Sequence, residues 1–198
     1  MIVFKNLNIA EPYQKFKRLY DKAFEKKQNV IQAICISSFS NKSNEVDSRF
    51  VNLKSIDNAD FIFFSNYDSP KSYQFESHNQ VSAVIYWPSI NIQIRVKAKI
   101  KKVSREYSDE YFKVRSREKN ALAISSLQSQ YIDSYDSVVD NFNKVLENSN
   151  TSIRPEYWGG YMFTPYEFEF WEGHDSRLNK RDLYSLKDDD WDHLILQP

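Results

Sequence analysis

The segment Asn91-Ile-Gln-Ile-Arg-Val-Lys-Ala-Lys-Ile-Lys-Lys-Val103 alternates between apolar and polar residues over most of its length. Successive side chains of a β-strand point to opposite faces. The apolar set that begins at Ile92 and the polar set that begins at Gln93 therefore occupy different faces. The segment predicts a long β-strand with one apolar face and one charged face.

The sequence on both sides of this segment repeats the β signal. Runs rich in β-branched and aromatic residues, separated by polar turns, cover residues 29–40, 49–56, 59–66, 80–87, 161–171, 181–186 and 191–196. Aromatic residues, which favour strands, make up 16% of the chain. The pattern predicts a mainly β protein with peripheral helices (α+β), closed into a barrel.

Three helices are expected around the strands. Residues 11–26 carry Pro12 in the first turn, followed by aromatic and aliphatic residues at helical spacing. Ser108 can cap a second helix, and residues 136–147 carry an apolar stripe that indicates a third. No repeat or linker divides the chain, so we expect residues 1–198 to form a single domain.

Composition excludes several classes of function. Lys+Arg and Asp+Glu both total 27, so the net charge is zero and no nucleic-acid partner is expected. No apolar stretch is long enough to span a membrane, and the N-terminus does not resemble a signal peptide. The single cysteine, Cys35, lies in an apolar run typical of a core thiol and suits a reducing compartment. We therefore expect a cytoplasmic protein without membrane contact.

Scarce glycine and histidine exclude further kinds of site. The three glycines cannot form a dinucleotide fingerprint or a P-loop, so side chains would have to hold any phosphorylated cofactor. Three scattered histidines and one cysteine disfavour a His/Cys metal site, and no metal is expected.

Candidate anion ligands occur in three places, one of which is the short run Ser69-Pro-Lys71. Arg49 and Lys54 flank one short run, but in a continuous strand they point to opposite faces. Tyr111, Arg115 and Lys119 are spaced by four, so one continuous helix would place a phenol and two cations on a single face. That arrangement can grip a phosphate. Solvated strand and helix charges remain the alternative for both sets.

Several short motifs follow one another in a distinctive order. The most specific are Tyr157-Trp-Gly-Gly160, Glu169-Phe-Trp171 and Arg177-Leu-Asn-Lys-Arg181. The earlier ones are Arg49-Phe-Val-Asn-Leu-Lys54, Phe64-Ser-Asn66, Ser69-Pro-Lys71, the segment from Trp87 to Gln93, Tyr111-Phe-Lys-Val-Arg115 and Gln128-Ser129. In this order the motifs resemble the pyridoxamine/pyridoxine 5'-phosphate oxidase family over nearly the whole chain.

The resemblance implies an FMN-binding split β-barrel that forms a homodimer with FMN at the interface. Its C-terminal family segment covers about residues 156–198. The implied reaction is FMN-dependent oxidation of pyridoxamine 5'-phosphate or pyridoxine 5'-phosphate to pyridoxal 5'-phosphate. Molecular oxygen is the implied acceptor, and H2O2 is the second product.

The resemblance also implies residue roles. The implied FMN ligands, some of them from the other subunit, are Arg49, Phe50, Val51, Lys54, Phe64, Ser65, Lys71, Gln93, Gln128, Ser129, Trp171 and Arg181. The implied substrate-phosphate ligands are Lys54, Tyr111, Arg115 and Lys119. Arg177 and Asn179 are implied at the substrate ring.

Three positions depart from the family pattern. Pro70 stands where the family often carries a second basic residue for the FMN phosphate. Lys119 replaces a serine at the substrate phosphate, and Asn179 replaces a histidine beside the ring. Two alternatives therefore stay open: a diverged FMN oxidase that acts on another ring, as the phenazine-pathway relatives do, and a non-enzymatic protein that binds flavin or B6 phosphate.

Overall fold

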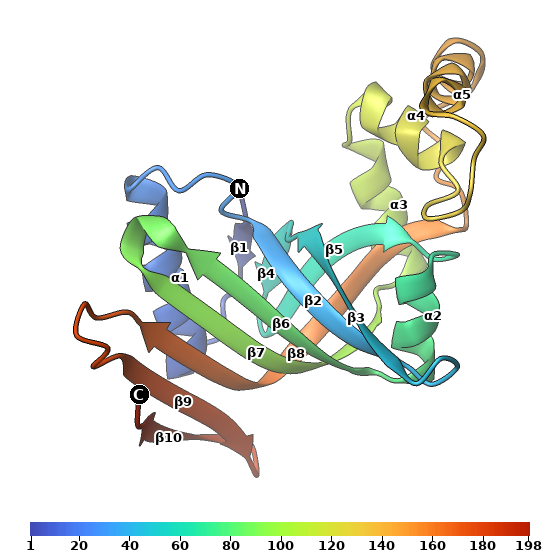
Figure 1. Cartoon of the computed structure of the whole chain (residues 1–198). Coiled ribbons are helices and arrows are strands. Elements are labelled where there is room, and N and C mark those ends of the chain that lie inside the picture. The colour runs from blue at the N-terminus through green and yellow to red at the C-terminus, as the bar shows by residue number, and fades with distance from the viewer.

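The computed structural model describes residues 1–198, which form one ten-stranded sheet surrounded by helices (Figure 1). The strands are β1 Val3–Lys5, β2 Ala33–Ser40, β3 Glu45–Asn52, β4 Ser55–Asp57, β5 Asp60–Asn66, β6 Gln80–Trp87, β7 Ile92–Lys102, β8 Trp158–Glu172, β9 Lys180–Lys187 and β10 Asp190–Leu196. The helices are α1 Glu11–Glu25, α2 Pro70–Ser77, α3 Arg105–Lys113, α4 Arg117–Ser125 and α5 Tyr135–Asn148, with a 3₁₀ turn η1 at Pro88–Ile90.

The sheet curls into a split β-barrel. Its strand order is β1-β4-β5-β8-β7-β6-β2-β3, and β9 and β10 extend it from β8. The long strand β8 pairs with β5 along its first part and with β9 along its last part, while β7 runs along its other edge. A register shift between Lys97 and Ala98 bends the β7–β8 pair. The mainly β barrel with peripheral helices that the sequence predicts is confirmed.

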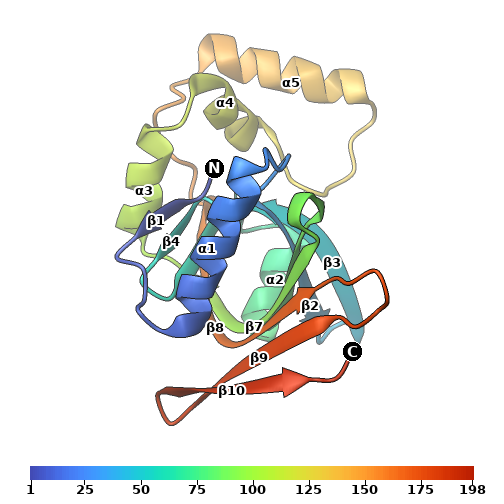
Figure 2. The same cartoon turned by 90° about the vertical axis from the view of Figure 1, so that its left-hand side faces the viewer.

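Aromatic side chains fill the barrel. Phe61, Phe163 and Phe168 are completely buried. Helix α1 adds Phe16, whose ring centroid lies 5.2 Å from that of Phe61 and 5.6 Å from that of Trp87, both in edge-to-face geometry. Such pairs stabilise the fold beyond the burial of their area. Helix α1 therefore lies against the sheet as part of the core (Figure 2).

Two helix predictions are confirmed, and one boundary is corrected. The predicted helices at residues 11–26 and 136–147 correspond to α1 and α5. Helix α3 begins at Arg105, because Ser104 is the N-cap whose hydroxyl accepts the N–H of Tyr107 at 3.1 Å. Ser108 is instead buried inside the helix, where its hydroxyl accepts the N–H of Gly160 at 3.1 Å. This bond ties α3 to β8.

The prediction that Cys35 is a core thiol is wrong. Ile34 and Ile36 on β2 point into the core, so the alternation of the strand places Cys35 on the outer face. The thiol is half-buried there, opposite Phe50 of β3 and Val84 of β6.

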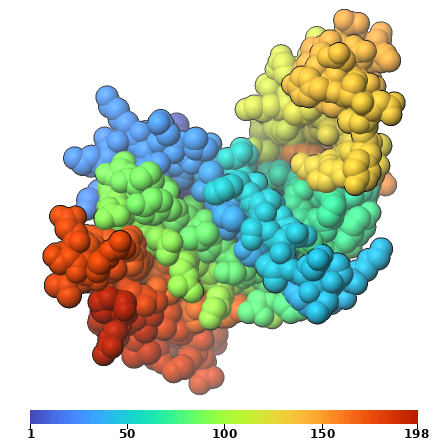
Figure 3. Space-filling view, viewed as in Figure 1, coloured from blue at the N-terminus to red at the C-terminus, as the bar shows by residue number.

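Two parts of the molecule lie at opposite ends. Helices α4 and α5 stand away from the barrel as an arm, and no residue of α5 is buried (Figure 3). The C-terminal hairpin β9–β10 lies at the other end in both cartoon views (Figures 1 and 2). No helix of this structure has both the length and the apolarity that a membrane span requires. No group of three or more His, Cys, Asp or Glu side chains is arranged to hold a metal ion.

Candidate functional site

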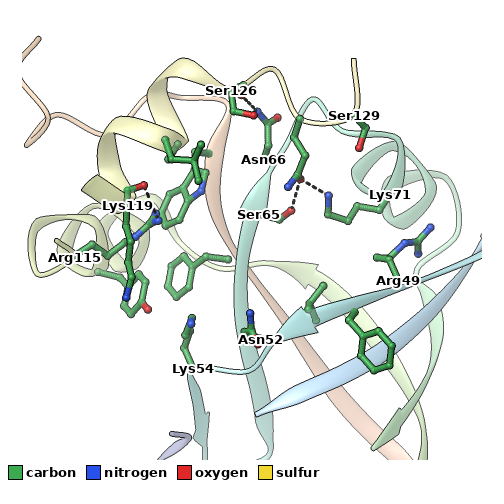
Figure 4. A pocket seen from close by; sticks show the side chains of 18 of the residues that line it. Arg49, Asn52, Lys54, Ser65, Asn66, Lys71, Arg115, Lys119, Ser126 and Ser129 are labelled. Atoms are coloured by element: carbon green, nitrogen blue, oxygen red, sulfur yellow. Dashed lines mark hydrogen bonds between the residues drawn. The ribbon is translucent and has the colours of Figure 1, made fainter. Parts of the chain in front are cut away.

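A cavity of about 750 Å³ lies between the barrel and the arm (Figure 4). It is lined by Arg49, Phe50, Val51, Asn52, Lys54, Phe64, Ser65, Asn66, Lys71, Tyr111, Val114, Arg115, Ser116, Lys119, Leu122, Ala123, Ser126, Gln128, Ser129 and Trp158. This lining contains five cationic side chains and no carboxylate. Such a pocket suits an anionic ligand.

The first cationic cluster consists of Arg49 on β3 and Lys71 in the first turn of α2. Arg49 is held by the hydroxyl of Ser38 at 2.6 Å and by the amide oxygen of Gln74 at 2.8 Å. Lys71 donates to the hydroxyl of Ser69 at 2.9 Å and to the amide oxygen of Gln128. Burial, followed by the nearby charge of Arg49, lowers the pKa of Lys71 to about 8. Two partly buried cations whose closest partners are neutral fit a phosphate group.

The second cationic cluster consists of Lys54, Arg115 and Lys119, on the other side of β5 (Figure 4). Burial, and then the charges of Lys119 and Arg115, lower the pKa of Lys54. The Arg115 guanidinium lies over the ring of Trp158 at 4.2 Å, and burial lowers its pKa. Its Nη1 atom is buried without a hydrogen-bond partner. A donor left unpaired in a cationic cluster indicates a second place for an anion.

Stacked aromatic rings line the cavity beside the second cluster. The ring centroids of Phe64 and Tyr111 are 3.8 Å apart and nearly parallel, and the Trp158 ring stacks on Phe64 at 5.2 Å. Burial raises the pKa of the Tyr111 phenol, so this hydroxyl keeps its proton and can donate a hydrogen bond to an anion.

The predicted strand and helix faces do not explain how these residues converge. The run 49–56 is not one strand, since β3 ends at Asn52 and β4 begins at Ser55. Lys54 lies in this break, where its N–H donates to the carbonyl of Ile62 at 2.8 Å. Arg49 and Lys54 therefore line the same cavity, although a continuous strand would separate them.

The single helix face predicted for Tyr111, Arg115 and Lys119 is also wrong. Helix α3 ends at Lys113, and α4 begins at Arg117. The turn between them nevertheless brings all three side chains to the cavity. The Nη2 atom of Arg115 donates to the carbonyl of Lys119 at 3.0 Å, which holds this turn against the first turn of α4.

Five predicted site residues lie away from the cavity. Gln93, Trp171 and Arg181 are register partners across β7, β8 and β9, and they form one row on the outer face of the sheet. Arg177 is exposed in the turn before β9 with a left-handed φ of 64°, and Asn179 follows it. Within one chain this β7–β9 row and the turn beside it do not border the pocket.

Asn179 is engaged within its own turn. Its side-chain oxygen accepts the N–H of His174 at 3.1 Å, and the N–H of Arg177 donates to the carbonyl of His174 at 2.9 Å. The amide group of Asn179 thus contributes to the conformation that presents Arg177.

Sequence reasoning assigned no role to several lining residues, among them Trp158 and Asn66. The Trp158 ring stacks on Phe64 and also packs against the Arg115 guanidinium. The sequence feature that could have indicated Trp158 as a site residue is the Tyr157-Trp-Gly-Gly160 motif. A Cβ atom at Gly159 would lie 2.2 Å from the Tyr67 hydroxyl, so this glycine permits a close approach beside Trp158.

The fold and the pocket define a split-barrel protein whose cavity, with two cationic clusters beside stacked aromatic rings, suits anionic, ring-bearing ligands. The chain belongs to the pyridoxamine 5'-phosphate oxidase family. The family model described as "Pyridoxamine 5'-phosphate oxidase" matches residues 21–149, and the model of the "Pyridoxine 5'-phosphate oxidase C-terminal dimerisation region" matches residues 158–198.

Curated relatives agree with this assignment. A pyridoxine/pyridoxamine 5'-phosphate oxidase of Legionella pneumophila (strain Paris) is 38% identical over 190 residues, which cover 95% of this chain and 88% of the relative. The enzyme of the same name from Rhodopirellula baltica is 35% identical over 192 residues, with 95% and 86% covered.

Solved structures share the fold. PhzG from Burkholderia lata 383, in complex with tetrahydrophenazine-1-carboxylic acid, has a TM-score of 0.90 and 24% identity, covering 96% of this chain and 93% of that one. A pyridoxamine 5'-phosphate oxidase-related, FMN-binding protein of Nostoc punctiforme has a TM-score of 0.75 and 12% identity, covering 92% and 97%. The family assignment supports FMN as the cofactor, as the sequence predicted, and the first cationic cluster fits its phosphate.

Proposed function

We propose that this protein is an FMN-dependent oxidase that converts pyridoxamine 5'-phosphate or pyridoxine 5'-phosphate to pyridoxal 5'-phosphate, with O2 as acceptor and H2O2 as product. The observation that carries the proposal is the presence of two cationic clusters in one cavity without carboxylates. Two clusters match the two phosphates that must be held together, one on FMN and one on the substrate. Membership of the family supports the same reaction.

The first cluster holds the FMN phosphate in this proposal. Arg49 and Lys71 supply the charges, and Ser65, Gln128 and Ser129 line the same cavity, with Ser65 and Lys71 both donating to the amide oxygen of Gln128. Phe50, Val51 and Phe64, which line the same cavity, would then contact the cofactor. Side chains take the role that a glycine-rich loop has in other nucleotide sites.

The second cluster holds the substrate phosphate. Lys54, Arg115 and Lys119 supply charge, and the phenolic O–H of Tyr111 donates a hydrogen bond. Because the phosphate is distant from the reacting carbon, its binding energy can be used to orient that carbon. Bound FMN supplies the redox chemistry, which is hydride acceptance from the C4' carbon and reoxidation by O2.

The site is completed by a second copy of the chain. Gln93, Trp171 and Arg181 would contact FMN, and Arg177 would cover the substrate ring, yet all four lie outside the pocket of their own chain. A two-fold dimer can bring this set to the pocket of its partner. The match of residues 158–198 to the family's dimerisation region supports this arrangement.

An oxidase of a phenazine precursor is the second candidate, since the PhzG fold is similar and Lys119 and Asn179 depart from the family pattern. The three cations of the second cluster favour a phosphate dianion over a single carboxylate. The decisive measurement is oxygen uptake by the FMN-loaded protein. Pyridoxamine 5'-phosphate should support turnover, and tetrahydrophenazine-1-carboxylic acid should not. Turnover only with the latter would establish the second candidate, and turnover with neither would favour a binding protein.

FMN affinity should fall as the pH rises from about 7 to about 9. The free site has a Lys71 pKa of about 8, so above that pH the lysine loses its charge before FMN binds. The FMN phosphate stays dianionic, because its second pKa is about 6. The dissociation constant should rise by up to about tenfold per pH unit above the Lys71 pKa. Flavin fluorescence titrations measure this change.

Two comparisons isolate the Lys71 effect. Riboflavin lacks the phosphate and should bind with little change over the same pH range. Lys71→Arg keeps its charge at every pH tested and should remove the slope. An unchanged slope in Lys71→Arg would show that another group titrates.

Lys119→Met should raise the KM for pyridoxamine 5'-phosphate about tenfold or more at low salt. A charge-assisted hydrogen bond to phosphate contributes about 1.5–3 kcal/mol, and about 1.4 kcal/mol corresponds to a factor of ten. The kcat should change little, since the phosphate is held alike before and during the reaction. Lys113→Met is the matched control, because Lys113 is exposed and lies outside the cavity. Equal KM values for the two variants would show that Lys119 is a solvated side chain that does not contact the substrate phosphate.

A further inference from the structure

Glu169 is a buried carboxylate between two arginines on the outer face of the sheet. It is only 7% exposed, although it faces away from the aromatic core. Arg95 on β7 is its direct register partner, and Arg181 on β9 is a diagonal neighbour, since Arg181 is the partner of Trp171 two residues further along β8. Diagonal neighbours on one face are within reach of long side chains.

Glu169 contacts one edge of the Arg181 guanidinium and so restrains its orientation. The Nε and Nη2 atoms of Arg181 lie 2.9 Å and 2.8 Å from the same carboxylate oxygen, Oε1. The other oxygen, Oε2, lies 3.2 Å from Nη1 of Arg95. At the far end of the guanidinium, Nη1 of Arg181 donates to the carbonyl of Gln197 at 3.0 Å. The guanidinium plane is therefore set by protein groups on two sides.

This restraint leaves Arg181 able to bind a ligand. Arginine has five N–H donors in a rigid fork, and the hydrogen bonds above use one on Nε and one on Nη1, while Nη2 is in ion-pair contact with the carboxylate. The remaining donors on Nη1 and Nη2 point away from Glu169. Trp171 is the register partner of Arg181, so the two side chains lie on the same face of the sheet.

We infer that Glu169 is a positioning residue for FMN, which holds Arg181 in the orientation that the partner subunit's pocket requires. The inference rests on the proposed function, because it takes Arg181 as an FMN ligand. Glu169 itself does not touch the cofactor. Without it, Arg181 and Arg95 would repel each other, and the guanidinium would have to be ordered when FMN binds. Ordering a flexible side chain at that stage weakens binding.

The test compares Glu169→Gln with Glu167→Gln in the dimeric, FMN-depleted protein. Glu167 is on the same strand and face, two residues away, and pairs with Lys97 at 2.9 Å rather than with Arg181. The two variants make the same chemical change. The FMN dissociation constant should rise about tenfold in Glu169→Gln, in line with a weakened charged hydrogen bond, and less than about twofold in Glu167→Gln.

A double-mutant cycle decides whether Glu169 acts through Arg181. In an Arg181→Ala background, Glu169→Gln should weaken FMN binding no further. A general loss of stability in β8 would instead appear in both backgrounds. An equal loss in both backgrounds, or no loss in the single variant, would overturn the inference. Failure of the unmodified protein to bind FMN would instead refute the proposed cofactor, so the two failures are distinct.

Discussion

A heterodimer that carries Arg115→Met in one subunit and Arg177→Ala in the other should oxidise pyridoxamine 5'-phosphate. The two homodimeric variants, assayed at the same substrate concentration well below KM, should show almost no oxidation. Arg115 lines the pocket of its own chain, whereas Arg177 lies outside it. If each site combines the pocket of one subunit with the Arg177 turn of the other, this heterodimer contains one intact site and one doubly altered site. The heterodimer can be purified through a different affinity tag on each subunit. It should have about half of the wild-type activity per dimer, because one of its two sites is intact.

The reciprocal heterodimer supplies the control. A wild-type subunit paired with a subunit that carries both substitutions contains the same two changes, but each of its sites receives one of them. It should therefore be nearly inactive. If every site were contained within one chain, the results would be reversed. The wild-type/double-variant dimer would then keep half of the activity, and the first heterodimer would have none.

Arg115→Met should raise the KM for pyridoxamine 5'-phosphate by about 30-fold or more, since truncating one partner of a buried charged pair costs roughly 2–5 kcal/mol. The side chain is placed on Trp158 before any ligand arrives, and its Nη1 atom lacks a partner. Little ordering energy is then needed when the phosphate binds. Methionine keeps much of the apolar contact with the ring, so the loss reports on the charge and the donors.

Steady-state kinetics and FMN titration separate this effect from a general disturbance. FMN affinity should stay close to the wild-type value, because the first cationic cluster is unchanged. Lys113→Met, two residues earlier, should leave KM unaltered. A large loss of FMN from Arg115→Met would mean that the second cluster binds the cofactor, and the two phosphate sites would have to be exchanged.

Local sequence patterns determined much of the fold. The alternation of apolar and polar residues at 92–102 predicted β7, because successive side chains of a strand point to opposite faces whatever the rest of the fold is. The apolar spacing in residues 11–26 likewise predicted α1. The order of the motifs identified the family, and the lack of a glycine loop indicated a phosphate site built from side chains. Twelve of the residues expected in the site do line one cavity.

Tertiary structure decided how those residues come together. Lys54 joins Arg49 because the strand breaks after Asn52, where the N–H groups of Leu53 and Lys54 bond to the carbonyls of Gln32 and Ile62. The helix break before Arg117 similarly brings Lys119 to Arg115. The pairing of β7, β8 and β9 places Gln93, Trp171 and Arg181 in one row, and the pocket of the same chain contains no residue of β7 or β9. The break between the helices is a local turn capped by Ser116, which a count of residues at helical spacing does not detect. The strand break and the position of the β7–β9 row depend on hydrogen bonds and strand pairings between segments that are distant in the sequence, and no local periodicity carries that information.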